Sequence, residues 1–305
     1  MNTLPTKNSM NGKICLVTGA TAGIGQKTAA ALAALGADVI ITGRNLQKTE
    51  QTVRQIKSET GNKAVHSLLA DFSDLEQVRA LAATFKDRFP RLDVLVNNAG
   101  AFFNTRHATP FGVEMTFLVN HLSPFLLTNL LLDTIQASAS ARIVNVSSDA
   151  HQYDTMDFDD LGFQRGYFSF KAYARSKLAN VLFTYELARR LGAGSVTVNA
   201  LHPGHVATDI WKTNFSVFGP PLKWMMSFFS LTPAQGADNS IYLASSPAVE
   251  KITGKYFDKR EAVQSAPISY DEKIARQLWE LSESLISIRK YPLDDPNLAV
   301  KFKGE

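Results

Sequence analysis

Tyr173 and Lys177 are the two residues whose types and spacing point most directly to chemistry. They lie four residues apart, so on a helix both side chains project from one face and can approach each other. A free tyrosine has a pKa of about 10, but a nearby ammonium favours the phenolate and lowers that pKa. The pair is therefore predicted to exchange a proton with a substrate, the alternative being an ordinary surface pair.

Two adjacent serines, Ser147 and Ser148, end a β-rich run that begins at Arg142. Side chains alternate along a strand, so the two hydroxyls face opposite ways, and the period alone does not say which could reach a substrate. A serine hydroxyl at this position could hydrogen-bond a substrate oxygen and stabilise its developing charge.

A glycine-rich turn follows the first predicted strand and opens the first predicted helix. It reads Thr18-Gly19-Ala20-Thr21-Ala22-Gly23-Ile24-Gly25. Glycines let the backbone approach a pyrophosphate, and a helix N-terminus favours the anion. The three-residue gap between the first two glycines departs from the G-x-G-x-x-G pattern. The position of the turn favours cofactor binding over the alternative, tight packing of strand and helix.

The elements that must position these residues alternate along the chain. Predicted strands cover 13–18, 39–42, 64–69, 92–96, 142–147 and 195–201; predicted helices cover 23–35, 46–60, 74–90, 112–135 and 167–191. Strands that are apolar nearly throughout are typical of a parallel sheet covered by helices on both faces. No repeat or linker divides the chain, so we expect one doubly wound α/β domain over residues 1–305, with about seven strands.

Composition excludes several classes of function. The chain is 45% hydrophobic and 20% charged, and its net charge of +4 is scattered, which gives no support to nucleic-acid binding. Cys15 is the only cysteine, so intrachain disulfides and cysteine-rich metal sites are excluded. His151, His202 and His205 fall on separate elements without metal-ligand spacing, and no metal is expected.

Targeting and membrane signals are absent from the sequence pattern. No stretch reaches about 18 apolar residues, so no membrane-spanning helix is predicted. The first twelve residues are polar and lack the basic and then apolar order of a signal peptide. We expect a cytoplasmic protein.

Five motifs, in chain order, resemble those of the short-chain dehydrogenase/reductase family over about residues 12–260. They are T-G-x-x-x-G-x-G at 18–25, N-N-A-G at 97–100, a strand with its serine at 142–148, Y-x-x-x-K at 173–177 and P-G-x-x-x-T at 203–208. A tyrosine four residues before a lysine is common by chance, but five motifs in order are not. Segments 120–122, 147–151, 176–180 and 202–204, with a long stretch between serine and tyrosine, are similar to the retinol dehydrogenase branch.

This resemblance implies a Rossmann-like fold and an oxidoreductase that transfers a hydride between a nicotinamide cofactor and a carbonyl or alcohol. It implies a catalytic set of Asn120, Ser148, Tyr173 and Lys177, in which Lys177 also holds the nicotinamide ribose and Asn120 anchors a water chain. Ser147 is then a strand-end polar residue. Besides Tyr173 and Lys177, the expected cofactor-binding residues are Gly19, Thr21, Gly23, Ile24, Gly25, Arg44, Asp71, Asn98, Ala99, Gly100, Pro203, Gly204 and Thr208.

The end of the second predicted strand decides between NAD(H) and NADP(H). NAD enzymes place an acidic residue there, about 20 residues past the glycines. This chain has Gly43 followed by Arg44, and Asp38 lies at the start of the strand, at the wrong edge of the sheet. A guanidinium suits a 2′-phosphate, unless Arg44 is simply a solvated surface residue. We expect NADP(H), and the resemblance implies that Asp71 contacts the adenine.

An aromatic and methionine-rich segment at 211–229 follows Thr208, and Gly219-Pro220-Pro221 interrupts it. We expect a lid near 205–235 over a lipophilic, retinoid-like aldehyde, ketone or alcohol, followed by a tail near 260–305. The segment could instead be ordinary core, the interface of a homo-oligomer, or a patch resting on a membrane with Lys212 and Lys223 at the headgroups.

The alternative function is a catalytically silent NADP-binding sensor or scaffold on the same fold, because a fold alone does not fix function. Such a relative need not keep Asn120, Ser148, Tyr173 and Lys177 together. The intact set favours an enzyme.

Overall fold

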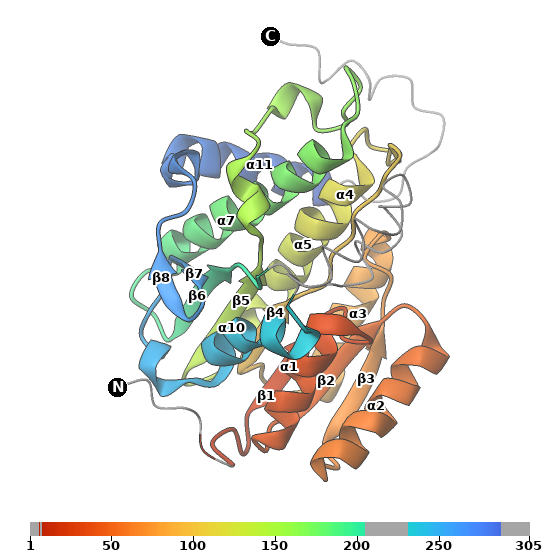
Figure 1. Cartoon of the computed structure of the whole chain (residues 1–305), viewed down its shortest axis with the longest axis vertical. Helices are drawn as coiled ribbons and strands as arrows, with labels where there is room; N and C mark the ends of the chain where they lie inside the picture. Colours follow the sequence, from red (N-terminus) through yellow and green to blue (C-terminus); the bar gives the residue numbers. More distant parts are fainter. Residues whose placement is uncertain (1–5, 7, 205–230, 288–305) are drawn as a thin grey trace.

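The computed structural model describes residues 6, 8–204 and 231–287. In this part of the chain one sheet of eight strands has the order β3-β2-β1-β4-β5-β6-β7-β8 (Figure 1). The strands are β1 (Ile14–Val17), β2 (Asp38–Gly43), β3 (Val65–Leu69), β4 (Val94–Asn97), β5 (Ala141–Val146), β6 (Val196–Leu201), β7 (Lys255–Asp258) and β8 (Glu261–Val263). The first seven are parallel, and β8 pairs antiparallel with β7. The predicted doubly wound α/β fold is confirmed, with one strand more than expected.

Helices cover both faces of the sheet (Figure 1). On one face lie α1 (Gly23–Ala34), α2 (Leu46–Thr60) and α10 (Pro233–Ser245), whose apolar side chains share a core with β1 and β2. On the other lie α3 (Leu75–Arg88), α4 (Met115–Phe117), α5 (Ser123–Leu130), α6 (Leu132–Gln136) and α7 (Ser169–Leu191). Strands buried on both sides explain why the sequence shows apolar runs and not alternation.

The strand order reverses between β1 and β4, which are neighbours in the sheet. Parallel strands end at the same edge, and ligands of open α/β sheets bind at the carboxyl ends where the order reverses. The four turns that follow β1, β4, β5 and β6 therefore meet there, and they carry the motifs at 18–25, 97–100, 147–148 and 203–204.

The predicted helix at 112–135 is wrong in detail, because the structure contains a series of shorter helical segments. The first of these segments, α4, begins at Met115, and the Glu114 carboxylate caps it by accepting a hydrogen bond from the Thr116 N–H at 2.7 Å. A π-helical turn, η1 (Leu118–Leu122), then separates α4 from α5. A π-turn holds one residue more than an α-turn and is typical of functional positions.

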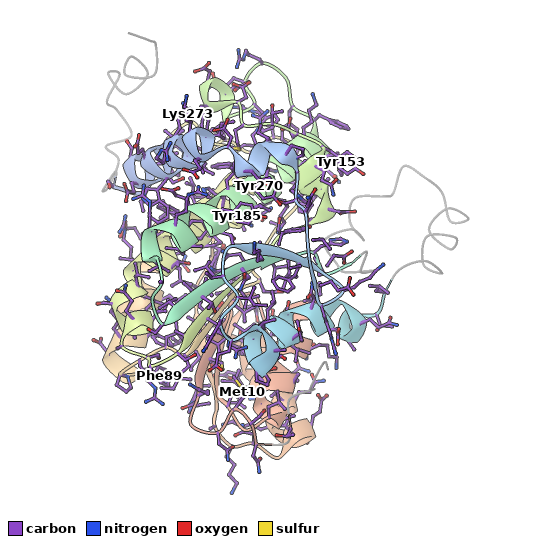
Figure 2. All side chains as sticks on the ribbon, turned by 90° about the vertical axis from the view of Figure 1, so that its left-hand side faces the viewer. Met10, Phe89, Tyr153, Tyr185, Tyr270 and Lys273 are labelled. Atoms are coloured by element: carbon purple, nitrogen blue, oxygen red, sulfur yellow. The ribbon has the colours of Figure 1, made fainter. Side chains whose placement is uncertain are left out.

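Beyond β6 the structure has elements that the sequence pattern did not predict. They are α10, β7, β8, a 3₁₀ turn η5 (Pro267–Tyr270) and α11 (Glu272–Ser287). Helix α11 packs on α7. Its Trp279 contacts Phe183 of α7 and Phe125 of α5, at ring-centroid distances of 5.8 and 4.9 Å. Figure 2 shows α11 above α7, with Tyr270 over Tyr185; the two rings stack at 5.4 Å.

Parts of the predicted lid and tail, residues 205–230 and 288–305, lie outside the described residues. Within the described ranges, none of the helices combines the length and the apolar character needed to cross a membrane.

Candidate active site

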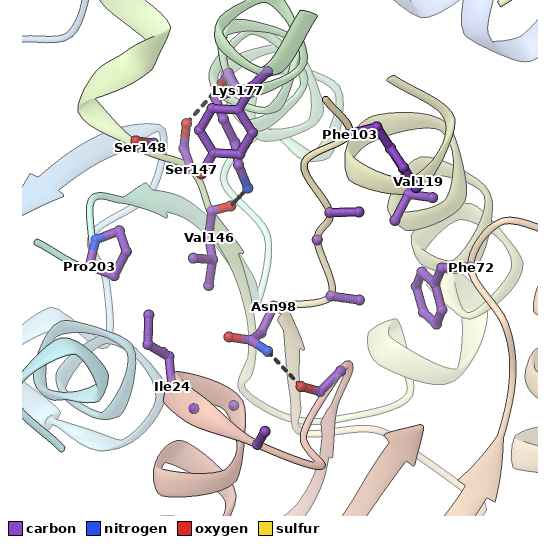
Figure 3. A pocket seen from close by; sticks show the side chains of 18 of the residues that line it. Ile24, Phe72, Asn98, Phe103, Val119, Val146, Ser147, Ser148, Lys177 and Pro203 are labelled. Carbon is purple, nitrogen blue, oxygen red and sulfur yellow. Dashed lines mark hydrogen bonds between the residues drawn. The ribbon is translucent and has the colours of Figure 1, made fainter. Parts of the chain in front are cut away.

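A cavity of about 920 Å³ opens at the carboxyl ends of the strands (Figure 3). Both parts of the predicted site line it. The predicted residues among its walls are Gly19, Thr21, Gly23, Ile24, Gly25, Arg44, Asp71, Asn98, Ala99, Gly100, Ser148, Tyr173, Lys177, Pro203 and Gly204. Asn120 lies behind the wall, and Thr208 is outside the described residues. One space therefore joins the expected cofactor residues to the expected catalytic ones.

The glycine-rich turn and the N-N-A-G segment hold each other in place. Gly19 has a φ of +61°, and a Cβ on it would lie 2.8 Å from the Ala99 Cα; a Cβ on Gly25 would lie 2.3 Å from the Asn98 Nδ2. The Asn98 amide donates to the carbonyl of Thr18 at 2.8 Å and to that of Gly19 at 3.2 Å, and Figure 3 marks the second of these bonds. Any larger residue at either glycine would push the two segments apart.

Helix α1 starts at the cavity with its first N–H groups free for a ligand. Its N-cap, Ala22, offers no side-chain hydrogen bond, and its first turn has no acidic residue. Uncapped N–H groups and the helix dipole together favour a phosphate at this point. The narrow approach at Gly19 and Gly25 and the uncapped helix fit a dinucleotide pyrophosphate.

At the far end of the cavity there is no room for a carboxylate at the end of β2, and a guanidinium lies on the rim instead. A Cβ on Gly43, the last residue of β2, would lie 2.3 Å from the Thr21 Cγ2 and 2.4 Å from the Thr49 Oγ1, so an acidic side chain does not fit without displacing them. Arg44 is 78% exposed on the rim, 4.0 Å from the Asp71 carboxylate. Asp38 begins β2 at the opposite edge of the sheet, as expected.

Tyr173 and Lys177 lie on α7, and both are buried. The Lys177 Nζ donates to the Val146 carbonyl at 3.0 Å and lies 5.4 Å from the centroid of the Tyr173 ring (Figure 3). Burial raises the pKa of Tyr173 to about 12, although a hydrogen bond with the Ser148 hydroxyl opposes the rise. Burial lowers the pKa of Lys177 to about 8. The expected lowering of the tyrosine pKa is therefore wrong, because desolvation dominates and the ammonium points to a carbonyl.

The two serines have different surroundings, as the strand alternation predicts. The Ser147 hydroxyl is buried and donates to the Lys177 carbonyl at 2.8 Å, which fixes α7 to the end of β5. The Ser148 hydroxyl hydrogen-bonds Tyr173, donates to the Asp149 carboxylate at 3.0 Å, and accepts the Ala150 N–H at 3.2 Å. The geometry favours Ser148 as the serine that meets a substrate.

Asn120 lies in the π-turn and is fully buried. Its Nδ2 donates to the Ala101 carbonyl at 3.0 Å and to the Ser176 Oγ at 2.9 Å, and its Oδ1 accepts the Ala101 N–H at 2.7 Å. A Cβ on Gly100 would lie 3.4 Å from the Asn120 Oδ1 and 3.6 Å from the Lys177 Nζ. The asparagine thus ties the residue that follows the N-N-A-G segment to Ser176 of α7, the neighbour of Lys177 in the chain.

Several residues of the site were missed by the sequence analysis. Aromatic and other apolar side chains line the cavity beyond Tyr173, and they are Phe103, Met115, Val119, Tyr153 and Phe170. His202 also lines it and accepts the Asp149 N–H at 3.2 Å. The resemblance of segment 202–204 to the retinol dehydrogenase branch is the signal that could have identified His202 as a site residue. In the described ranges no three His, Cys, Asp or Glu residues gather as a metal site.

Comparisons with known proteins agree with this geometry. Residues 13–217 match the family described as short chain dehydrogenase. The chain is 44% identical over 296 residues to retinol dehydrogenase 14 of Homo sapiens, covering 92% of this chain and 88% of the relative. It is 42% identical over 302 residues to retinol dehydrogenase 13 of Homo sapiens, covering 95% and 90%.

Solved structures show the same fold. A short chain dehydrogenase from Shigella flexneri, complexed with NADP, aligns with a TM-score of 0.67 and 27% identity over 84% of this chain and all of that one.

Proposed function

This chain belongs to the short-chain dehydrogenase family and is an oxidoreductase related to the retinol dehydrogenases, and we propose that it transfers a hydride between NADP(H) and a lipophilic carbonyl compound or alcohol. The observation that carries the proposal is the single cavity in which the glycine-rich turn, Tyr173, Lys177 and an apolar wall meet.

The proton chemistry belongs to Tyr173. With a pKa of about 12 it is protonated at neutral pH, so it can donate a proton to a carbonyl oxygen as that oxygen gains charge. The Ser148 hydroxyl, bonded to Tyr173, can donate its proton to the same oxygen by turning it away from the Asp149 carboxylate. Lys177 would hold the cofactor ribose, and Asn120 ties Ala101, which follows the N-N-A-G segment, to Ser176 beside Lys177 on α7. NADP(H), when bound, supplies or accepts the hydride.

The preference for NADP(H) is supported by the rim of the cavity. Gly43 leaves no room for the acidic side chain that would bind the ribose hydroxyls, and Arg44 can form charge-assisted hydrogen bonds to a 2′-phosphate. The Asp71 carboxylate lies 4.0 Å from the Arg44 guanidinium at that rim. The Shigella relative, which is complexed with NADP, agrees with this preference.

A lipophilic substrate is supported by aromatic side chains that lead from Tyr173 to the surface. Phe102 lies 5.5 Å from the Tyr173 ring, and Phe170 packs beside Tyr173. Tyr153 and Phe168 lie 5.9 and 6.5 Å from Phe170 and are 65% and 58% exposed. Exposed aromatic rings that continue a cavity wall are costly unless an apolar ligand covers them. A bulky, retinoid-like substrate fits this wall.

The test is turnover of a panel of retinoids, aliphatic aldehydes, steroids and quinones, followed by NADPH absorbance. Within an aldehyde series, each buried methylene should raise kcat/KM up to about fourfold, equivalent to about 0.8 kcal/mol, until the wall is covered. Phe170→Ala should abolish the rise of kcat/KM with chain length. Val263→Ala, which truncates an exposed side chain on β8, should leave that rise unchanged. If the kcat/KM of the wild type does not rise with chain length, and small polar carbonyls are turned over best, a lipophilic substrate is excluded.

A further inference from the structure

His151 is a fully buried side chain beneath Ser148 that the proposed reaction does not use. Its Nδ1 lies 2.7 Å from the Ser148 carbonyl oxygen, and its Nε2 accepts the backbone N–H of Ala266 at 2.9 Å. The ring also packs on Tyr256 at a centroid distance of 4.6 Å. Both nitrogens are thus engaged by main-chain groups from segments more than 100 residues apart in sequence.

The two partners fix the proton on the ring. A backbone N–H can only donate, so the Nε2 that receives it carries no proton, and the proton must lie on Nδ1. The Nδ1–H then donates to the Ser148 carbonyl. Burial lowers the pKa of His151, which keeps the ring neutral and the arrangement constant at neutral pH.

The bond to Ala266 connects Ser148 with the helix that carries Tyr173. Next to Ala266, the Ser265 hydroxyl shares hydrogen bonds with the Tyr185 hydroxyl at 2.7 Å and the Ser269 hydroxyl at 2.6 Å. Tyr185 lies on α7, three helical turns beyond Tyr173. Figure 2 shows Tyr185 on this helix, beneath Tyr270 of the turn that follows Ala266.

We propose that His151 is a positioning residue, which ties Ser148 to the Ala266 segment and thereby holds the serine at a fixed distance from Tyr173. The proposal rests on the role of Ser148 in the proposed function. Ser148 is also the N-cap of the 3₁₀ turn η2 (Asp149–Gln152), so a shift of its main chain would move the hydroxyl that meets the substrate.

The proposal is tested by two substitutions that each keep one of the two bonds. His151→Asn places an amide nitrogen near the Nδ1 position and keeps the bond to Ser148, whereas His151→Gln places an amide oxygen near the Nε2 position and keeps the bond to Ala266. Because the connection needs both bonds, we expect kcat to fall about 10–100-fold in each variant, with the KM for NADPH unchanged. The control is Ser138→Ala, which removes a buried hydrogen bond to the Leu92 carbonyl far from the site. It should lower Tm without changing kcat.

A double-mutant cycle separates positioning from general damage. In a Ser148→Ala background, His151→Asn and His151→Gln should cause no further loss of kcat, because the group that they displace is gone. A full additional loss in that background, or unchanged kcat in both single variants, would overturn the proposal.

The tautomer gives a readout that does not depend on turnover. The ¹⁵N shifts of the His151 ring, assigned by their absence in the variants, should report a neutral ring protonated at Nδ1. A proton on Nε2 would contradict the arrangement. If Ser148→Ala keeps the wild-type kcat, Ser148 does not have the proposed role, and the proposal for His151 fails with it. The reaction class is tested separately, by turnover of the carbonyl panel by the wild type.

Discussion

At the residue scale, the site places a phenol and an ammonium where burial opposes ionisation of both. The pKa of Tyr173 is raised to about 12 and that of Lys177 is lowered to about 8, in each case chiefly by desolvation. At neutral pH the tyrosine is therefore held as a proton donor rather than as a phenolate, whereas Lys177 is still mostly charged. A carbonyl substrate, whose oxygen gains charge during reduction, is the partner that this state suits.

Tyr173→Phe should bind NADPH as tightly as the wild type but lose its proton donor. We expect turnover to fall by about 10²–10⁴. NADPH fluorescence titration measures binding, and NADPH absorbance with a substrate from the panel measures kcat. Near wild-type turnover in a correctly folded variant would contradict the assignment of Tyr173.

Arg44→Ala should weaken NADPH binding far more than NADH binding. One charge-assisted phosphate contact is worth roughly 1.5–3 kcal/mol, or about 10–150-fold in Kd. The matched control is Arg54→Ala, which makes the same change in charge at an exposed position on α2. Equal weakening of both cofactors by Arg44→Ala would exclude a 2′-phosphate contact.

Lys177→Met should abolish turnover and yet stabilise the fold at pH 7. Each pKa unit is worth about 1.4 kcal/mol, so a lysine lowered from 10.5 to about 8 costs about 3 kcal/mol while it is charged. Removing the charged lysine removes this cost, but losing its hydrogen bond to the Val146 carbonyl offsets about 1–1.5 kcal/mol of the stabilisation. Between pH 8 and 10.5 the unfolded wild-type chain binds more protons than the folded one, so wild-type stability rises with pH.

The free energy of unfolding of Lys177→Met should exceed that of the wild type at pH 7, and this difference should decrease by about 2 kcal/mol between pH 7 and pH 9.5. Urea denaturation of both proteins at the two pH values measures it. An advantage that is absent at pH 7, or one that grows with pH, would show that the folded lysine is not desolvated.

At the scale of the elements, the sequence predicted those whose cause is local. The first six strands were found because five of them are short, largely apolar runs, and the edge strand β3, which reads VHSLL, lies between two predicted helices. Helix α2 was found because Asn45 caps it, accepting the Lys48 N–H at 2.9 Å, and Gly61 ends it with a φ of +71°. Strand β8 was missed because its three residues are all exposed and carry no apolar pattern.

The C-terminal helix α11 was missed although its signal is local. Apolar residues recur at helical spacing along it, at Ala275, Leu278, Trp279, Leu285 and Ile286, and the Asp271 carboxylate accepts the Lys273 N–H at 2.8 Å at its start. This apolar face packs against Phe125 and Phe183, which come from α5 and α7. The Arg190 guanidinium lies 4.2 Å from the centroid of the Trp279 ring and covers its other side. The predicted tail near 260–305 therefore contains a helix whose apolar spacing is already visible in the sequence.

Trp279→Ala should cost about 3–5 kcal/mol of the free energy of unfolding, because it leaves a cavity between α11, α5 and α7. The control is Lys273→Ala on the exposed face of α11, where the change should stay within about 0.5 kcal/mol. Urea denaturation with a shared m-value gives both numbers. A loss below about 1 kcal/mol would mean that α11 contributes little to the core.

At the scale of the whole molecule, the cofactor half of the cavity was predictable and the substrate half was not. Glycines, the N-N-A-G segment and the tyrosine–lysine pair follow strand ends or occupy a helix face, so topology alone brings them together. The apolar wall comes from the loops around Phe103 and Tyr153 and from the first turn of α7 at Phe170, whose positions depend on packing that no short pattern records. This is why the sequence predicted the reaction class more sharply than the substrate.

The π-turn at Asn120 also restricts how the length of this chain can change during evolution. The wide turn accommodates one residue more than an ordinary α-turn, so deleting one residue within Leu118–Leu122 would restore an ordinary turn and leave the two flanking helices in phase. Ser123, bonded to the Phe72 carbonyl at 2.6 Å, and Thr128, bonded to Asn97 at 3.0 Å, would keep their partners, whereas Asn120 would be displaced from Ala101 and Ser176. Related sequences that lack one residue in this stretch should therefore keep the helix packing and lose the asparagine from the site.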